Sequence, residues 1–167
     1  MKYLYVCRHG ESLANAQGTY AGHLDTPLTD RGRNQARQAG DQARKLHFDI
    51  ITSSTLGRAV ETAQIIAHEV GYTPEDILQN PLFMERNLGS LQGRPFSVPA
   101  DPAHFPDMES AEALHERGLR ALDYLHGLDA ECILLVSHGT FLNTLRNIVA
   151  GYAADEELPN ATIVRLI

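Results

Sequence analysis

Two short stretches of the sequence place a histidine before a glycine, directly after an apolar run. The first, YVCRHGES, contains Arg8 and His9, and the second, CILLVSHG, ends in His138 and Gly139. A third apolar run, in DIITSSTLGR, leads through hydroxyl residues to Arg58. Together, imidazole and guanidinium groups would suit a phosphoryl group, because its oxygens carry negative charge and its transfer depends mostly on positioning and electrostatic stabilisation.

Phosphoryl transfer also needs a nucleophile and a proton donor. A neutral histidine qualifies as nucleophile, because its imidazole can attack phosphorus and form a covalent intermediate. Glu85, in LFMERNLGSLQG, is the best candidate donor, since it follows a short apolar segment and precedes two glycines that would let the backbone approach a ligand. Glu11 and Glu109 lie beside other motifs and remain alternatives.

The eight histidines do not form a metal-binding pattern. The stretch AHEVG has no second histidine four residues on, and Arg8 beside His9 would repel a cation. We therefore expect no metal ion, and the phosphoryl transfer described above also needs no organic cofactor.

The elements that must position these groups alternate between strand and helix. Three apolar runs predict buried strands, and four segments have helical spacing. The strands are expected at 3–7, 50–51 and 132–136, with a closing strand at 161–167; the helices are expected after Thr29, at about 56–70, from Ser110, and after Gly139. This order indicates an α/β fold, in which ligands bind at the carboxyl ends of the strands. His9, His138, Arg8 and Arg58 could therefore converge, and the helix after Gly139 would offer its first N–H groups to a phosphate.

The ends of these helices carry recognisable signals. Thr29 or Asp30 is expected to cap the first helix. The second has three candidate caps, Ser53, Ser54 and Thr55, and should end at Gly71. In the helix after Gly139 we expect Leu142, Leu145 and Val149 to face inward, with Gly151 following.

The chain of 167 residues is expected to form one domain, 1–167. Periodicity disappears at about 93–109, where prolines cluster, so this short segment is a candidate lid or insertion. The net charge of −7, from 14 basic and 21 acidic residues, argues against nucleic acid as a partner. No apolar run approaches the ~18 residues that span a bilayer. Cys7 and Cys132 lie in apolar runs, which fits free thiols and a cytoplasmic location.

Five motifs in order carry a resemblance to a known family. They are RHGES with Asn15 four residues after Glu11, DTPLTDRGRNQA, SSTLGRAVETA, ERNLGSLQG and SHG. Together, over Tyr3 to Leu166, they resemble the histidine phosphatase superfamily, in its phosphoglycerate-mutase-like branch. The resemblance implies a three-layer α/β/α fold with a mostly parallel central sheet.

The resemblance also implies a role for each matching residue. His9 resembles the phosphorylated nucleophile, and Arg8, Arg58 and His138 resemble the rest of the phosphate pocket. Glu85 resembles the proton donor, and Asn15, Gly22 and Gly139 resemble substrate or phosphate contacts. One nitrogen of His9 should be held as a donor, by a backbone carbonyl, so that the other is free to attack.

We therefore expect a metal-independent phosphomonoester hydrolase that acts on a small phosphorylated metabolite through a phosphohistidine. Mutases of this family carry a longer insertion, additional basic residues and a carboxyl-terminal extension, whereas Arg94 is the only Lys or Arg between Arg86 and Arg117 here. Mutase-type transfer and a non-catalytic module that binds phosphorylated metabolites remain alternatives. An exposed closing strand at 161–167 could also pair across a homodimer.

Overall fold

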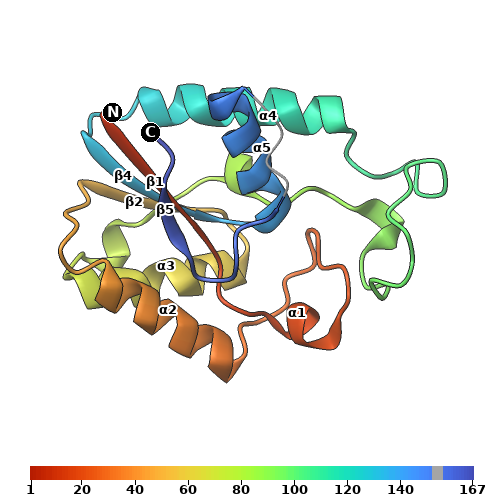
Figure 1. Ribbon diagram of the computed structural model, residues 1–167, viewed down its shortest axis with the longest axis horizontal. Coiled ribbons are helices and arrows are strands. Elements are labelled where there is room, and N and C mark those ends of the chain that lie inside the picture. The colour runs from red at the N-terminus through yellow and green to blue at the C-terminus, as the bar shows by residue number, and fades with distance from the viewer. Residues whose placement is uncertain (152–155) are drawn as a thin grey trace.

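A central five-stranded sheet organises the computed structural model, which describes residues 1–151 and 156–167. The strand order is β3-β2-β4-β1-β5, and all neighbours are parallel except β5, which runs antiparallel to β1 at one edge (Figure 1). The strands are β1 (Tyr3–Arg8), β2 (Ile50–Ser53), β3 (Leu78–Gln79), β4 (Cys132–Ser137) and β5 (Ile163–Arg165). The expected mostly parallel sheet is thus confirmed, and the two-residue β3 is an addition that sequence reasoning missed.

Helices cover both faces of the sheet and make the fold a three-layer α/β/α structure. As Figure 1 shows, α2 (Asp30–Gln42) and α3 (Gly57–Val70) lie on one face, and α4 (Ala111–His126) and α5 (Gly139–Ala150) lie on the other. Successive side chains of a strand point to opposite faces. Accordingly Ile133 and Leu135 pack with α4 and α5, whereas Leu134 and Val136 pack with α2 and α3.

The register of the parallel strands brings their carboxyl ends to one level. Arg8 is paired with Ser137, and the His9 amide donates to the Ser137 carbonyl over 2.9 Å. On the other side of β4, the Ser54 amide donates to the Val136 carbonyl over 3.1 Å. The residues that follow β1, β2 and β4 therefore meet at the same edge of the sheet.

Most of the predicted helix ends are confirmed. Thr29 caps α2 and Ser110 caps α4, each accepting a backbone N–H with its hydroxyl oxygen. Gly71 and Gly151 end α3 and α5 in the left-handed conformation, at φ 76° and 73°.

Two details of the helix predictions were wrong. The residue that caps α3 is Leu56, which has no side-chain acceptor, and the first helical amide, that of Gly57, instead donates to Asp25 over 2.8 Å. A carboxylate from a distant loop thus replaces the expected Ser or Thr cap. Val149 is 39% exposed rather than inward, because it lies in the last turn of α5, beyond the buried stripe.

The segments between these elements contain short helices that the periodicity did not reveal. They are α1 (Leu13–Gln17), η1 (Pro74–Asp76), η2 (Pro81–Phe83) and η3 (Gly89–Leu91). Each has five residues or fewer, which is too short for a hydrophobic period to show.

The proline-rich segment 93–109 contains no helix or strand, and it packs against the loop that follows α1. Thr19 forms an isolated bridge with Pro95, and the Tyr20 hydroxyl donates to the Val98 carbonyl over 3.0 Å. The rings of Tyr20 and Phe96 meet edge to face, with centroids 5.0 Å apart. These contacts place the segment beside the carboxyl ends of the strands.

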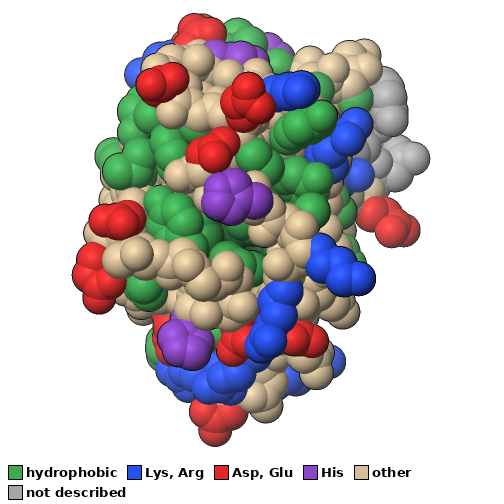
Figure 2. Space-filling view, turned by 90° about the vertical axis from the view of Figure 1, so that its left-hand side faces the viewer, with side chains coloured by type: hydrophobic (Ala, Val, Ile, Leu, Met, Phe, Trp, Pro, Cys, Tyr) green, Lys and Arg blue, Asp and Glu red, His purple; other side chains and the backbone are tan. Residues whose placement is uncertain are grey.

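Figure 2 shows the opposite side of the molecule, where the parallel strands begin. Hydrophobic side chains gather in the middle of this face, and acidic, basic and histidine side chains are scattered around them. None of the helices in residues 1–151 and 156–167 is long and apolar enough to cross a membrane.

Candidate active site

A cavity of about 230 Å³ opens at the carboxyl ends of β1, β2 and β4. Its lining includes six of the residues singled out from the sequence: Arg8, His9, Asn15, Gly22, Arg58 and Glu85. The other two, His138 and Gly139, are buried directly behind it. The fold therefore brings together residues that are spread over most of the chain.

The two ring nitrogens of His9 have different partners, and one of the nitrogens is unprotonated. Its Nδ1 lies 2.6 Å from the carbonyl oxygen of Gly10, so Nδ1 carries the proton. Arg58 Nε donates to the other nitrogen, Nε2, over 3.3 Å. Burial, followed by the charge of Arg58, lowers the pKa of His9 well below its ordinary value. His9 is therefore a neutral imidazole whose Nε2 is unprotonated and accepts from Arg58, and a neutral imidazole can act as a nucleophile.

Arg58 is fixed by two backbone carbonyls from the loop after α1. Its side chain is 1% exposed, and its terminal nitrogens donate to Leu24 and Gly22, each over 2.7 Å. Gly22 adopts φ +52°, and a Cβ there would collide with Gln92. The glycine therefore lets the loop turn so that its carbonyl reaches the guanidinium.

His138 lies against His9, with ring centroids 5.1 Å apart. Its Nε2 is 2.7 Å from the Ser54 hydroxyl, which already accepts the Leu56 amide, so the hydroxyl proton is available to Nε2. The ring proton then resides on Nδ1, which is buried and has no hydrogen-bond partner among the described residues. Burial, then Arg58, lowers the pKa of His138 well below its ordinary value. This leaves the Nδ1 of His138 as an unpartnered donor next to His9.

Arg8 provides the second guanidinium of the cavity and faces a carboxylate that the sequence did not point to. One nitrogen donates to the Leu158 carbonyl over 2.9 Å and lies 3.2 Å from Glu157. Glu157 also accepts the Thr140 hydroxyl over 3.0 Å and lines the cavity. Because β5 is antiparallel to β1, β5 begins beside the carboxyl end of β1. The residues that precede β5, including Glu157, therefore lie at the site.

The carboxylate of Glu85 lies at the amino terminus of α5. It accepts the amides of Thr140 over 3.2 Å and Phe141 over 3.0 Å. Burial raises the pKa of Glu85, and the nearby Glu157 acts in the same direction, while the amide donors oppose the shift. A raised pKa favours the protonated acid that a leaving alcohol requires. The expectation that these helix amides face a phosphate was wrong for Thr140 and Phe141, because Glu85 already uses them.

The two alternative carboxylates are engaged away from the cavity. Glu11 accepts the Thr29 hydroxyl over 2.8 Å at the start of α2, and Glu109 forms an ion pair with Arg117 at 2.8 Å. In the part of the chain that the structure describes, Glu85 and Glu157 are the carboxylates that line the cavity. Glu85 therefore remains the best placed candidate for the proton donor.

The weaker candidates have more local roles. Asn15 uses its side-chain oxygen in a capping box with Ser12 at the start of α1, and it also lines the cavity. Gly139 begins α5, where a Cβ would collide with Glu157 and lie 3.2 Å from the Arg8 guanidinium carbon. Both positions thus support the walls of the cavity.

The cavity lining also contains apolar residues. Its walls include aromatic and aliphatic residues from the loop after α1 and from the proline-rich segment: Tyr20, Leu88, Phe96, Ala100 and Met108. Phe96 is 52% exposed. A ligand in the cavity would therefore meet apolar side chains as well as polar ones, with Arg86 as an additional cation.

The comparison with protein families decides what kind of protein this is. The model of the histidine phosphatase superfamily (branch 1) matches residues 4–166. The chain belongs to the histidine phosphatase superfamily. Both the sequence resemblance and the expected fold class are thereby confirmed, and the protein is a phosphatase-type enzyme of this superfamily.

Several relatives of this histidine phosphatase carry different names. It is 35% identical over 185 residues to a protein of Enterobacter sp. named "Probable phosphoglycerate mutase GpmB", covering 99% of this chain and 85% of that protein. A phosphoserine phosphatase of Entamoeba histolytica, solved with 3-phosphoglyceric acid, superposes with a TM-score of 0.80 at 26% identity and covers 99% and 90% of the two chains. A mycobacterial glucosyl-3-phosphoglycerate phosphatase shares the fold, with a TM-score of 0.85 at 23% identity and coverage of 99% and 90%.

Proposed function

We propose that this histidine phosphatase hydrolyses small phosphomonoesters through a phosphohistidine at His9, without a metal ion. The observation that carries the proposal is the geometry of His9. Gly10 holds Nδ1 as a donor at 2.6 Å, so Nε2 is the unprotonated ring nitrogen of a residue that lines the cavity, and it accepts a hydrogen bond from the buried Arg58. A nucleophile set up in this way needs no further activation by a base.

The groups around His9 suit the charge of the transferred phosphoryl. Arg58 Nε would shift its hydrogen bond from His9 Nε2 to a phosphoryl oxygen, and Arg8 would exchange its contact with Glu157 for a second phosphoryl oxygen. The unpartnered Nδ1 of His138 would donate to a third position. Together these donors would stabilise the negative charge that is spread over the phosphoryl oxygens.

The reaction then takes two steps. His9 Nε2 bonds to phosphorus as the ester oxygen departs, and Glu85 gives its proton to that oxygen to release the alcohol. In the second step Glu85 removes a proton from water as the water oxygen attacks the phosphohistidine. This releases inorganic phosphate and restores neutral His9.

Mutase-type transfer is the second candidate, because the relative named above carries a phosphoglycerate mutase name at 35% identity. We favour hydrolysis because Arg86 is the one cavity arginine in the described residues outside the inner pair, Arg8 and Arg58. A bisphosphorylated intermediate would need further cations for its second phosphate. The substrate of the proposed hydrolase would be a small phosphorylated metabolite, and residues 93–109 would form one wall of the cavity around it.

The test is phosphate release from p-nitrophenyl phosphate in EDTA by the native protein, His9→Ala and the control His47→Ala, whose histidine is 92% exposed. We expect turnover by the native protein and the control, and a loss of at least ~10⁴-fold in His9→Ala. A phosphomonoester with a radioactive phosphoryl group should label the native protein, and the label should be lost in acid, as expected of a phosphohistidine. Activity that EDTA abolishes, or that survives the loss of His9, would contradict the proposal. Formation of 2-phosphoglycerate from 3-phosphoglycerate without phosphate release would favour the mutase.

A further inference from the structure

Glu85, the proposed acid, lies in a stretch of backbone without regular secondary structure. It follows the single turn η2 and precedes the single turn η3, and residues 85–88 belong to no helix or strand. Backbone carbonyls in such a stretch have no partners from a helix or sheet and must find them elsewhere. Within the segment, the Glu85 carboxylate accepts the Arg86 amide over 2.9 Å, but the backbone that carries Glu85 must be held by groups from outside the segment.

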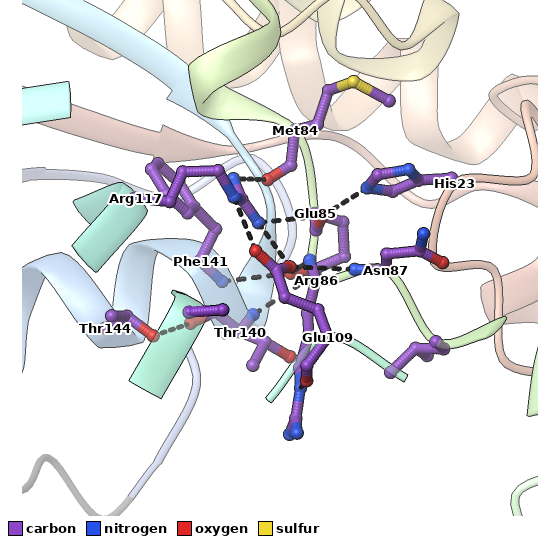
Figure 3. A network of polar contacts seen from close by, with 12 residues as sticks. His23, Met84, Glu85, Arg86, Asn87, Glu109, Arg117, Thr140, Phe141 and Thr144 are labelled. Atoms are coloured by element: carbon purple, nitrogen blue, oxygen red, sulfur yellow. Dashed lines mark hydrogen bonds and ion pairs between the residues drawn. The ribbon is translucent and has the colours of Figure 1, made fainter. Parts of the chain in front are cut away.

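Arg117, on α4, supplies these partners. Figure 3 shows its guanidinium beside the backbone of Met84 and Glu85. It donates to the carbonyls of Leu82 over 2.9 Å, Met84 over 2.7 Å and Glu85 over 3.2 Å. Two further bonds, each 2.8 Å long, join it to both carboxylate oxygens of Glu109. These five bonds match the five N–H donors of a guanidinium, so its whole donor capacity is in use.

The surroundings of Arg117 reinforce this arrangement. Its side chain is 12% exposed and that of Glu109 is 15% exposed, so the pair is largely removed from water. Glu109 also accepts the amide of Asn87 with its carboxylate and the Arg86 side chain with its carbonyl. The network therefore binds the backbone on both sides of Glu85.

Arg117 also contacts the group that binds the Glu85 carboxylate. Its guanidinium carbon lies 4.8 Å from the centre of the Phe141 ring, within the range of a cation–π contact. The amide of the same Phe141 donates to Glu85. On the opposite side, His23 Nε2 lies 2.7 Å from the Glu85 carbonyl oxygen (Figure 3). Arg117 thus touches both the backbone that carries the acid and the residue that receives its carboxylate.

We propose that Arg117, held by Glu109, is a positioning residue that aims the Glu85 carboxyl at the leaving oxygen. This inference rests on the proposed function, because it assigns Glu85 the role of acid. Arg117 does not line the cavity, so it would act through Glu85 and not by contact with the substrate. Displacement of a reacting group by about 1 Å can cost roughly 100-fold in rate. Loss of the Arg117 hydrogen bonds should therefore mainly slow proton donation by Glu85.

The experiment compares two esters whose leaving groups differ mainly in basicity. The p-nitrophenolate ion leaves without a proton, whereas the phenol of phenyl phosphate depends more on the acid. In Arg117→Met we expect kcat/KM for phenyl phosphate to fall roughly tenfold further than for p-nitrophenyl phosphate. The matched control is Arg120→Met on the same helix, whose arginine is exposed, and it should change neither value. Equal losses on both esters in Arg117→Met would overturn the proposal.

Two further variants keep the test decisive if Arg117→Met does not fold. Arg117→Lys keeps the charge but has three donors, and Glu109→Gln keeps one acceptor for the arginine. Both should show the same preference for the better leaving group, to a smaller extent. If they lose activity equally on both esters, Arg117 contributes only to stability and the proposal fails.

A measurement without turnover separates this inference from the proposed function. The pKa of Glu85 can be followed by NMR of the labelled carboxyl in the native protein, Arg117→Met and Arg117→Lys. The charged groups acting on that carboxyl are Glu157, before β5, and Arg58, on α3, and none of these variants alters them. We expect the raised pKa to move toward the ordinary glutamate value as the carboxyl becomes exposed. An unchanged pKa of Glu85 in these variants would contradict the positioning role of Arg117, whether or not the native protein hydrolyses either ester. Failure of the native protein to hydrolyse both esters would instead contradict the proposed function.

Discussion

The two ends of the cavity are held by different parts of the fold. At the phosphate end, His9 and His138 directly follow neighbouring strands, and the His9 amide is bonded to Ser137 of β4. At the acid end, Glu85 lies in irregular backbone whose carbonyls are held by side chains from α4 and the loop after α1. Sheet hydrogen bonds thus fix His9, the proposed nucleophile, whereas side chains hold the backbone of Glu85, the proposed acid. Damage to one end should therefore be distinguishable from damage to the other.

The largest difference is expected on removal of the acid itself. Glu85→Gln should lower kcat/KM for phenyl phosphate by ~10²–10⁴-fold, because general acid catalysis contributes about that much. The loss on p-nitrophenyl phosphate should be much smaller, since that leaving group needs no proton. Steady-state kinetics with both esters checks this. A loss of the same size on both would place Glu85 at the phosphate end.

A change at the phosphate end should not discriminate between leaving groups. Arg58→Lys removes the planar pair of donors that binds Gly22 and Leu24 and weakens the stabilisation of the phosphoryl oxygens. We expect kcat/KM to fall by ~10²–10³-fold on both esters, the usual effect of losing one such donor. Thermal unfolding of the variant shows whether the fold survives. A preference for either leaving group would mean that Arg58 also serves the acid.

The pH dependence should separate the two ends in one experiment. In the proposed mechanism, activity needs neutral His9, whose lowered pKa preserves the neutral form down to acid pH. It also needs protonated Glu85, whose raised pKa preserves the protonated form to higher pH. The kcat/KM of the native protein should therefore fall as pH rises through the raised pKa of Glu85, up to tenfold per pH unit. Glu85→Gln cannot lose a proton at this position and should lose this alkaline limb. Titration of the substrate phosphate affects both proteins equally, so an alkaline limb that persists unchanged would contradict the assignment.

The smallest expected effect concerns the loop that holds Arg58. Gly22→Ala places a Cβ at φ +52° against Gln92 and should destabilise the protein by about 1–3 kcal/mol. Thermal unfolding measures the loss, and Gly71→Ala is a matched control, because a Cβ there meets nothing within 4 Å although φ is +76°. We expect Gly22→Ala to lower turnover of both esters alike, and Gly71→Ala to affect stability only. Similar turnover in the two variants would show that the loop does not position Arg58.

The residues of the phosphate end could be predicted from the sequence because regular secondary structure has a recognisable pattern of apolar residues. Apolar runs identify β1, β2 and β4, and parallel strands in one sheet must end at one edge, so His9, His138 and Arg58 follow from the pattern. The same reasoning placed the α5 amides at the phosphate and failed, because it could not know that Glu85 reaches Thr140 and Phe141.

The amino-acid sequence by itself determined the sheet, the four long helices and the strand ends that carry the histidines, because burial of apolar side chains imposes a period that can be read locally. Only the tertiary structure decided the direction of Glu85, its clamp by Arg117 and the return of Glu157 beside Arg8. These contacts join residues far apart in the chain, through irregular backbone that has no period. They form between side chains and carbonyls that meet only once the sheet and its helices have packed.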